Sequence, residues 1–93
     1  MVKVKVCGIT YLRDAEAAVR LGADAIGFIF APSPRRITPE AARKIARSMG
    51  PYVTLVGVFV NETPGRMLKI VARCRLNVIQ LHGDETSQIC RGL

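Results

Sequence analysis

Short apolar runs alternate strictly with longer segments of helical periodicity, and this alternation constrains the fold more than any other feature. Four runs have strand length and are rich in Val, Ile and Phe: 3–7, 23–30, 53–60 and 77–81. Three segments between them place apolar residues at three- and four-residue spacing: 12–21, 39–49 and 64–75. Strand and helix in regular succession require crossover connections, which give a parallel sheet.

The expected helices have recognisable ends. Thr38 and Thr63 each precede a proline, so a capping hydroxyl stands before a first-turn proline. Gly22 and Gly50 stand where the first two helices should end. The final stretch, ETSQICRGL, has the composition of an opening fourth helix, with Asp84 and Glu85 in its first turn.

Four such β/α units are half of an eightfold barrel, for which about 250 residues are typical. We therefore predict an α/β fold in which residues 1–93 form one domain. That domain is the N-terminal (β/α)4 half of a parallel (β/α)8 barrel, or TIM barrel. Its first and fourth strands should be open edges, so we expect the chain to self-associate or to pair with a C-terminal half-barrel.

Composition excludes several classes of protein. No apolar run approaches the roughly 18 residues that span a bilayer, so we expect no membrane partner. An odd number of cysteines, without a C-x-x-C pair and with one histidine, predicts neither a disulfide framework nor a metal site. A reducing, cytoplasmic location fits this pattern best; the cysteines are Cys7, Cys74 and Cys90.

The net charge of +7 suits nucleic acid or a phosphorylated substrate. Most basic residues are spread over three helical segments, where solvated faces explain them, and only Arg35 and Arg36 are adjacent. A small basic nucleic-acid binder is the weaker alternative, because Phe28, Phe30 and Phe59 lie in buried-type strands and do not form a stacking platform. We predict a small phosphorylated substrate and no nucleic acid.

The first strand alternates Val with Lys and ends on a thiol. With a period of two, Lys3, Lys5 and Cys7 share one face, and Val2, Val4 and Val6 share the other. The valine face should meet the helices, so the lysines and the thiol should point into the barrel. Lys5 then lies about 7 Å from Cys7, and its ammonium would stabilise a thiolate. Interior lysines also predict acidic partners.

Polar residues follow several of the expected strands, at the carboxyl ends where parallel barrels carry their active sites. Cys7, the pair Arg35 and Arg36, Asn61 and the pair Gln80 and His82 all fall at this rim. A cysteine at a strand end is more often inert packing than catalytic, and Asn61 fits a turn or a helix cap. Each signal is weak alone.

Four sequence blocks carry a resemblance to a known family. VKVCGIT, GADAIGFIFAPSPRRITPE, VGVFVNE and VIQLHGDE resemble, in order and spacing, the consecutive signature blocks of the phosphoribosylanthranilate isomerases of tryptophan biosynthesis. The resemblance covers essentially the whole chain and stops midway through the family's barrel. It implies an Amadori rearrangement of N-(5-phosphoribosyl)anthranilate to 1-(2-carboxyphenylamino)-1-deoxyribulose 5-phosphate, with no cofactor and no metal.

The same resemblance assigns roles to individual residues. It implies that Cys7 is the general base and that Arg35 helps to bind the anionic substrate. Arg36 occupies a position that is often aromatic in the family, so the choice between the two arginines stays open. Gln80 and His82 would line the anthranilate side of the pocket.

Two parts of the family's site would lie beyond this chain. The general acid is an aspartate on the sixth strand, and the phosphate is held by glycine-rich loops after the last two strands. The alternative function is therefore a non-catalytic half-barrel that self-assembles or pairs with a separate C-terminal half.

Overall fold

The structure is a computed structural model that describes residues 4–82 and 88–91. Strands and helices alternate as the sequence predicts, with somewhat shorter bounds. The elements are β1 (Lys5–Cys7), α1 (Leu12–Arg20), β2 (Ala25–Ile29), α2 (Pro39–Ser48), β3 (Thr54–Val60), α3 (Pro64–Cys74), β4 (Val78–His82) and β5 (Gln88–Arg91).

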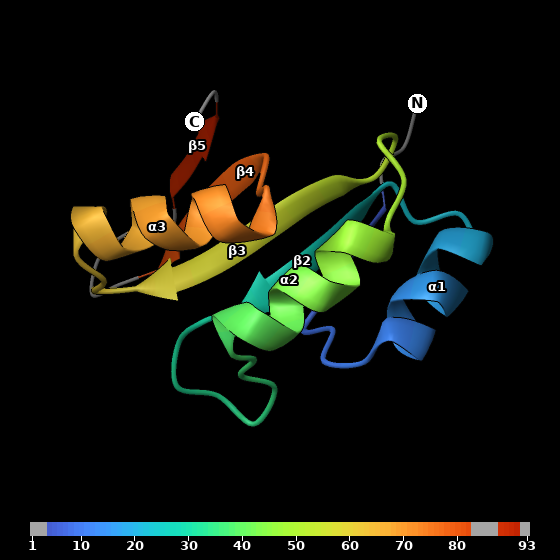
Figure 1. Cartoon of the computed structure of the whole chain (residues 1–93), viewed down its shortest axis with the longest axis horizontal. Coiled ribbons are helices and arrows are strands. Elements are labelled where there is room, and N and C mark those ends of the chain that lie inside the picture. Colours follow the sequence, from blue (N-terminus) through green and yellow to red (C-terminus); the bar gives the residue numbers. More distant parts are fainter. Residues whose placement is uncertain (1–3, 83–87, 92–93) are drawn as a thin grey trace.

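One sheet runs through the molecule in the order β1-β2-β3-β4-β5 (Figure 1). The first four strands are parallel, as expected for β/α units joined by crossover helices. Their register aligns Cys7 with Gly27, and Gly27 with Val56. The predicted parallel half-barrel is confirmed.

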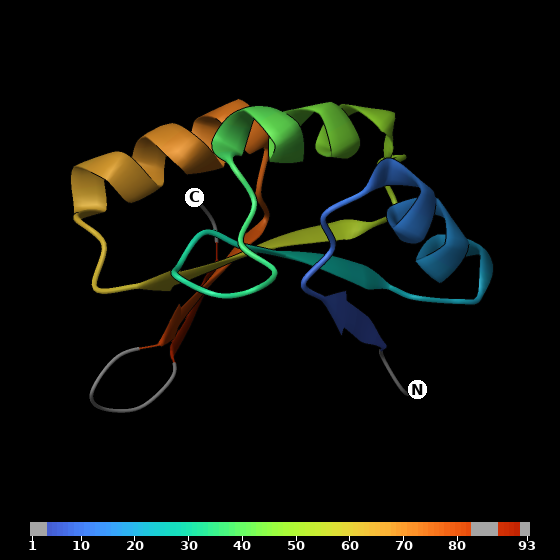
Figure 2. The same cartoon turned by 90° about the horizontal axis from the view of Figure 1, so that it is seen from below.

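The three helices of the described residues lie on one side of this sheet (Figure 2), and the core fills the space between the two layers. Phe28 and Phe59 are its largest fully buried side chains. The helices contribute small residues, Ala15 and Ala42 among them, which let them approach the sheet closely. None of the helices within the described residues is long and apolar enough to cross a membrane.

The helix starts follow the predicted chemistry. The Oγ1 atoms of Thr38 and Thr63 each accept a backbone N–H three residues further on, and proline fills the first helical position of α2 and α3. Gly22 adopts φ +102° just after α1, as its predicted stop position requires. In contrast, α3 ends on Arg75 in the left-handed region at φ +54°, with no glycine to mark it.

The prediction of a fourth helix is wrong for the part of that segment that the structure describes. Residues 88–91 form β5, which pairs antiparallel with β4. Pairing satisfies backbone groups that β4 would otherwise present at an open edge, and this gain outweighs weak helical periodicity. The expectation that the fourth strand is an open edge is therefore wrong, because β5 pairs with it. Asp84 and Glu85 lie outside the described residues.

The two faces of the sheet alternate as the first strand predicts. Val6 packs against the core beneath the helices, whereas Lys5 projects from the opposite, concave face. There the Lys5 Nζ donates a hydrogen bond of 2.6 Å to the Gln80 Oε1. This bond joins the first strand to the fourth, which requires a strongly curved sheet. Lys3 and Val2 lie outside the described residues.

Candidate active site

Cys7 is the last residue of β1 and is partly buried at the carboxyl end of the sheet. The chain turns sharply after it, because Gly8 adopts φ +82°. The backbone N–H groups of Gly8 and Ile9 both donate to the carbonyl oxygen of Gly27, at 3.0 and 3.2 Å. These bonds fix the peptide that follows the thiol and hold Cys7 against β2.

Gly27 is the neighbour that makes room for the thiol. A Cβ atom placed on Gly27 would lie 2.8 Å from the Cys7 Sγ and 3.2 Å from the Cys7 Cα. Side chains at these paired positions lie on the same face, so any side chain here would displace the sulfur. Sequence reasoning missed this residue, although a glycine within a strand often marks such a close approach.

The structure separates the two adjacent arginines. The Arg35 stem lies over Gly8: a Cβ added to Gly8 would lie 2.7 Å from the Arg35 Cδ and 3.4 Å from its Nη1. The Arg35 backbone N–H donates to the Ser33 Oγ, which shapes this loop. Arg36 instead lines a cavity on the helix side of the sheet. Of the two arginines, Arg35 is therefore the one that lies against Gly8, the residue that follows Cys7.

Lys5 and Gln80 form the polar part of the concave face. Lys5 was expected to require an acidic partner, but its ammonium is exposed and bonds to an amide oxygen, so water and Gln80 share its solvation. Lys5 precedes Cys7 by two residues and lies on the same strand face. The concave face thus combines a thiol, an ammonium and an amide.

Asn61 and His82 are the two remaining residues that were predicted at the rim. Asn61 directly follows β3, and His82 ends β4. His82 is the last residue of β4, where its backbone is in register with Val60. Asn61 adopts φ +50°, which fits its predicted place in the turn before α3. Thr63, not Asn61, caps that helix.

This arrangement can support proton transfer and anion binding. A thiol can act as a base once it is deprotonated, and the guanidinium of Arg35 is a planar donor that can bind an anion. Within residues 4–82 and 88–91, no group of three or more His, Cys, Asp or Glu residues could hold a metal ion. A cavity of about 980 Å³ lies on the other side of the sheet, between α2 and α3, and does not include Cys7.

Comparison with known proteins identifies the family. The family model for N-(5'-phosphoribosyl)anthranilate (PRA) isomerase matches residues 4–92, almost the entire chain. The chain belongs to the phosphoribosylanthranilate isomerase family. The resemblance found in the four sequence blocks is therefore confirmed.

Individual isomerases are also similar to this chain. The N-(5'-phosphoribosyl)anthranilate isomerase of Moorella thermoacetica is 50% identical over 93 residues, which are 100% of this chain and 42% of that protein. The crystal structure of the Thermotoga maritima isomerase superposes with a TM-score of 0.89 at 53% identity, covering 92% of this chain and 42% of that one.

A second solved structure shows an isomerase in complex with reduced 1-(o-carboxyphenylamino)-1-deoxyribulose 5-phosphate. It also has a TM-score of 0.89 and 53% identity, and the match covers 92% of this chain and 45% of that one. The chain therefore spans less than half the length of the relatives that it matches.

Proposed function

We propose that this chain provides the N-terminal half of an active site for the Amadori rearrangement of N-(5-phosphoribosyl)anthranilate in tryptophan biosynthesis. The observation that carries the proposal is the placement of Cys7 beside Gly27, with Arg35 against the adjacent Gly8, at the carboxyl end of the sheet, in a chain of this family. Residues 1–93 act as one half-barrel domain in the cytosol.

The reaction needs an acid and a base. An acid protonates the ribose ring oxygen, the C1′–O bond breaks, and the C1′–N bond gains double-bond character. The Cys7 thiolate then removes the proton from C2′, which gives the enol-amine, and this tautomerises to the ketone. Family resemblance implies that the acid lies on the sixth strand, in a C-terminal half-barrel.

The other predicted residues bind substrate. Arg35 grips an anionic group of the substrate with its forked guanidinium, and Gln80 and His82 line the pocket near the anthranilate ring. The structure supports the choice of Arg35 over Arg36, because only Arg35 lies against Gly8. No metal or organic cofactor takes part in this scheme.

Complementation tests this proposal. The chain is assayed alone and after mixing with a separately expressed C-terminal half of an isomerase, by following the loss of fluorescence of the anthranilate adduct. We expect activity in the mixture only. If the two halves associate but neither sample is active, the alternative of a non-catalytic half-barrel would be favoured. That alternative is also compatible with the length of the chain, which covers less than half of each relative.

Two substitutions test the residue assignments within the complemented enzyme. Cys7→Ala should lower kcat by about 10² or more with little change in KM, because a base acts in the transition state. Arg35→Ala should mainly raise KM. Unchanged turnover in Cys7→Ala would return this thiol to a packing role, and a binding defect confined to Arg36→Ala would reverse the choice between the arginines.

A further inference from the structure

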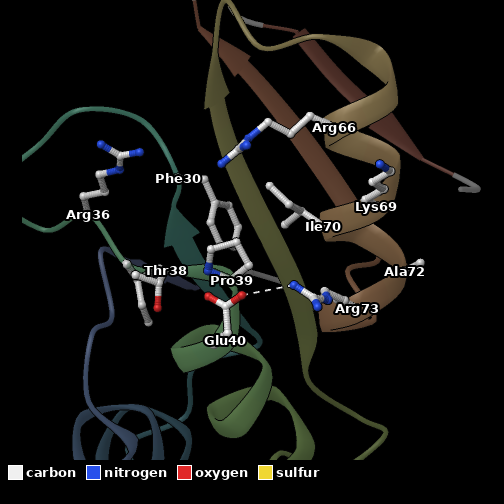
Figure 3. A pocket seen from close by; sticks show the side chains of 11 residues that line it. Phe30, Arg36, Thr38, Pro39, Glu40, Arg66, Lys69, Ile70, Ala72 and Arg73 are labelled. Carbon is white, nitrogen blue, oxygen red and sulfur yellow. Dashed lines mark hydrogen bonds and ion pairs between the residues drawn. The ribbon is translucent and has the colours of Figure 1, made fainter.

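A second concave surface lies on the helix side of the sheet, between the start of α2 and the length of α3 (Figure 3). Its volume of about 980 Å³ is at the upper end of small-molecule sites. The lining residues are Phe30, Arg36, Ile37, Thr38, Pro39, Glu40, Arg66, Lys69, Ile70, Ala72 and Arg73. We call this surface the cationic cavity.

The cationic cavity has an apolar floor and charged walls. Phe30, Ile37 and Ile70 are only 5–7% exposed and form the floor. Four of the eleven lining residues are basic, compared with 14 of 93 in the whole chain, so positive charge is concentrated here. Only one lining residue, Glu40, is acidic.

This charge is only partly compensated. The Arg73 Nη1 bonds to the Glu40 Oε1 at 3.0 Å, and the Arg66 Nε lies 3.3 Å from Glu62. Both arginine side chains are about 60% exposed, so these pairs are weak and can open toward a ligand. Within the part of the chain that the structure describes, Arg36 and Lys69 form no ion pair.

Charge and shape together select the occupant. A second copy of this chain, with a net charge of +7, would be repelled. Nucleic acid lacks a stacking platform here, because Phe30, the one aromatic residue among the described residues that line the cavity, is buried. The basic side chains come from the loop before α2 and from successive turns of α3, so they can contact separate anionic groups at once (Figure 3).

We propose that the cationic cavity binds a small anion with two or more phosphate or carboxylate groups, separately from the candidate site at Cys7. Arg36, Arg66 and Arg73 contact these groups through forked guanidinium donors, and Lys69 contributes a point charge. The positive end of α2, which begins at Pro39 on the cavity wall, attracts the same ligand.

Titration of the 93-residue chain with pyrophosphate, and separately with citrate, tests this site by calorimetry and by amide chemical shifts. The double variant Arg36→Gln/Lys69→Gln removes two cavity charges. Its matched control, Arg20→Gln/Arg47→Gln, removes two exposed helix charges that do not line the cavity. We expect about tenfold weaker binding in the first variant and less than about twofold in the second.

The shifted amides should lie within 36–40 and 66–73. Stronger binding of pyrophosphate would identify phosphate as the preferred group, and stronger binding of citrate would identify carboxylate. If both double variants bind the anions equally weakly, the binding reflects only the general attraction between the basic chain and anions, and the proposed site is overturned. Loss of binding in Arg35→Gln, or failure of both probes at 0.15 M salt, would overturn it as well.

Discussion

The position of Cys7 depends on the absence of a side chain at Gly27. In the sheet these residues are direct partners, and the Cys7 sulfur occupies the space that a Cβ at Gly27 would take. The contact involves the Cys7 backbone as well as its side chain, so rotation of the thiol alone cannot relieve it. Gly27 thus acts on the candidate base by positioning it.

Gly27→Ala should therefore cost about 1–3 kcal/mol of unfolding free energy, since extra volume in a packed site forces the backbone to shift. The matched control is Gly65→Ala, because a Cβ on Gly65 meets nothing within 4 Å. Gly65 lies within α3, so that change should stabilise by up to about 1 kcal/mol. Urea denaturation midpoints compare the two variants, and equal midpoints would contradict the close approach of Gly27.

Cys74 links stability to pH. Burial raises the pKa of its thiol above the ordinary value of 9.0; the carboxylate of Glu40 also raises it, while Arg73 and Arg43 act in the opposite direction. The thiol also donates a hydrogen bond of 3.4 Å to the carbonyl of Pro39, which favours the protonated form. Above pH 9.0 the unfolded chain therefore loses this proton before the folded chain does.

The contribution of the protonated Cys74 thiol to the free energy of unfolding is thus fully present below pH 9.0 and is lost as pH rises above it. Cys74→Ala should cost about 1–2 kcal/mol at pH 7 by leaving a small cavity. The gap between the two proteins should narrow as pH rises above 9.0, while the lysines and tyrosines, common to both, cancel in the comparison. Unfolding free energies measured from pH 7 to 10 decide this, and a constant gap would contradict the assignment.

The sequence predicted the residues at the rim better than their contacts. Period two placed Lys5 and Cys7 on the concave face, because side-chain alternation is a local property of a strand. The choice between Arg35 and Arg36 depends on a loop whose path is set by contacts with Gly8 and Ser33. Such long-range and turn-specific contacts leave no periodic signal.

Helix ends show the same division between local and distant causes. Thr38 and Thr63 cap their helices as predicted, because the cap is formed by residues three apart. The end of α3 falls where the predicted segment 64–75 ends, but the left-handed conformation of Arg75 was not predicted, since the residue in that position is ordinarily glycine. The β5 strand was missed because its partner, β4, determines its conformation.

Arg75→Gly should stabilise the protein by about 0.5–1 kcal/mol, because glycine adopts φ +54° without a Cβ penalty. A substitution to glycine inside α3 provides the control. Lys69→Gly places glycine at an exposed interior position and should destabilise by about 1 kcal/mol. Thermal unfolding of the two variants should shift in opposite directions, and a decrease in both would contradict the strained end of α3.

The concave face bears on how the whole molecule assembles, because in a complete barrel it would face the other half. On it, Val56 and Val58 are already buried, whereas Val60, in register with His82, is 38% exposed. Since β5 occupies the outer edge of β4, the edge strands of the sheet within the described residues are β1, which pairs with β2 alone, and β5. Association with a C-terminal half would therefore have to cover both β1 and the exposed end of β3.

Val60→Lys tests this requirement without disturbing the lone chain. An exposed substitution should change its unfolding free energy by no more than about 0.5 kcal/mol. Covering the new ammonium in an assembled barrel would be costly, so we expect about tenfold weaker association with the C-terminal half, measured by sedimentation. Leu68→Lys, at an exposed position on α3, should leave association unchanged. Equal association of both variants would show that the concave face is not the surface that assembles, and that complementation, if observed, proceeds through another contact.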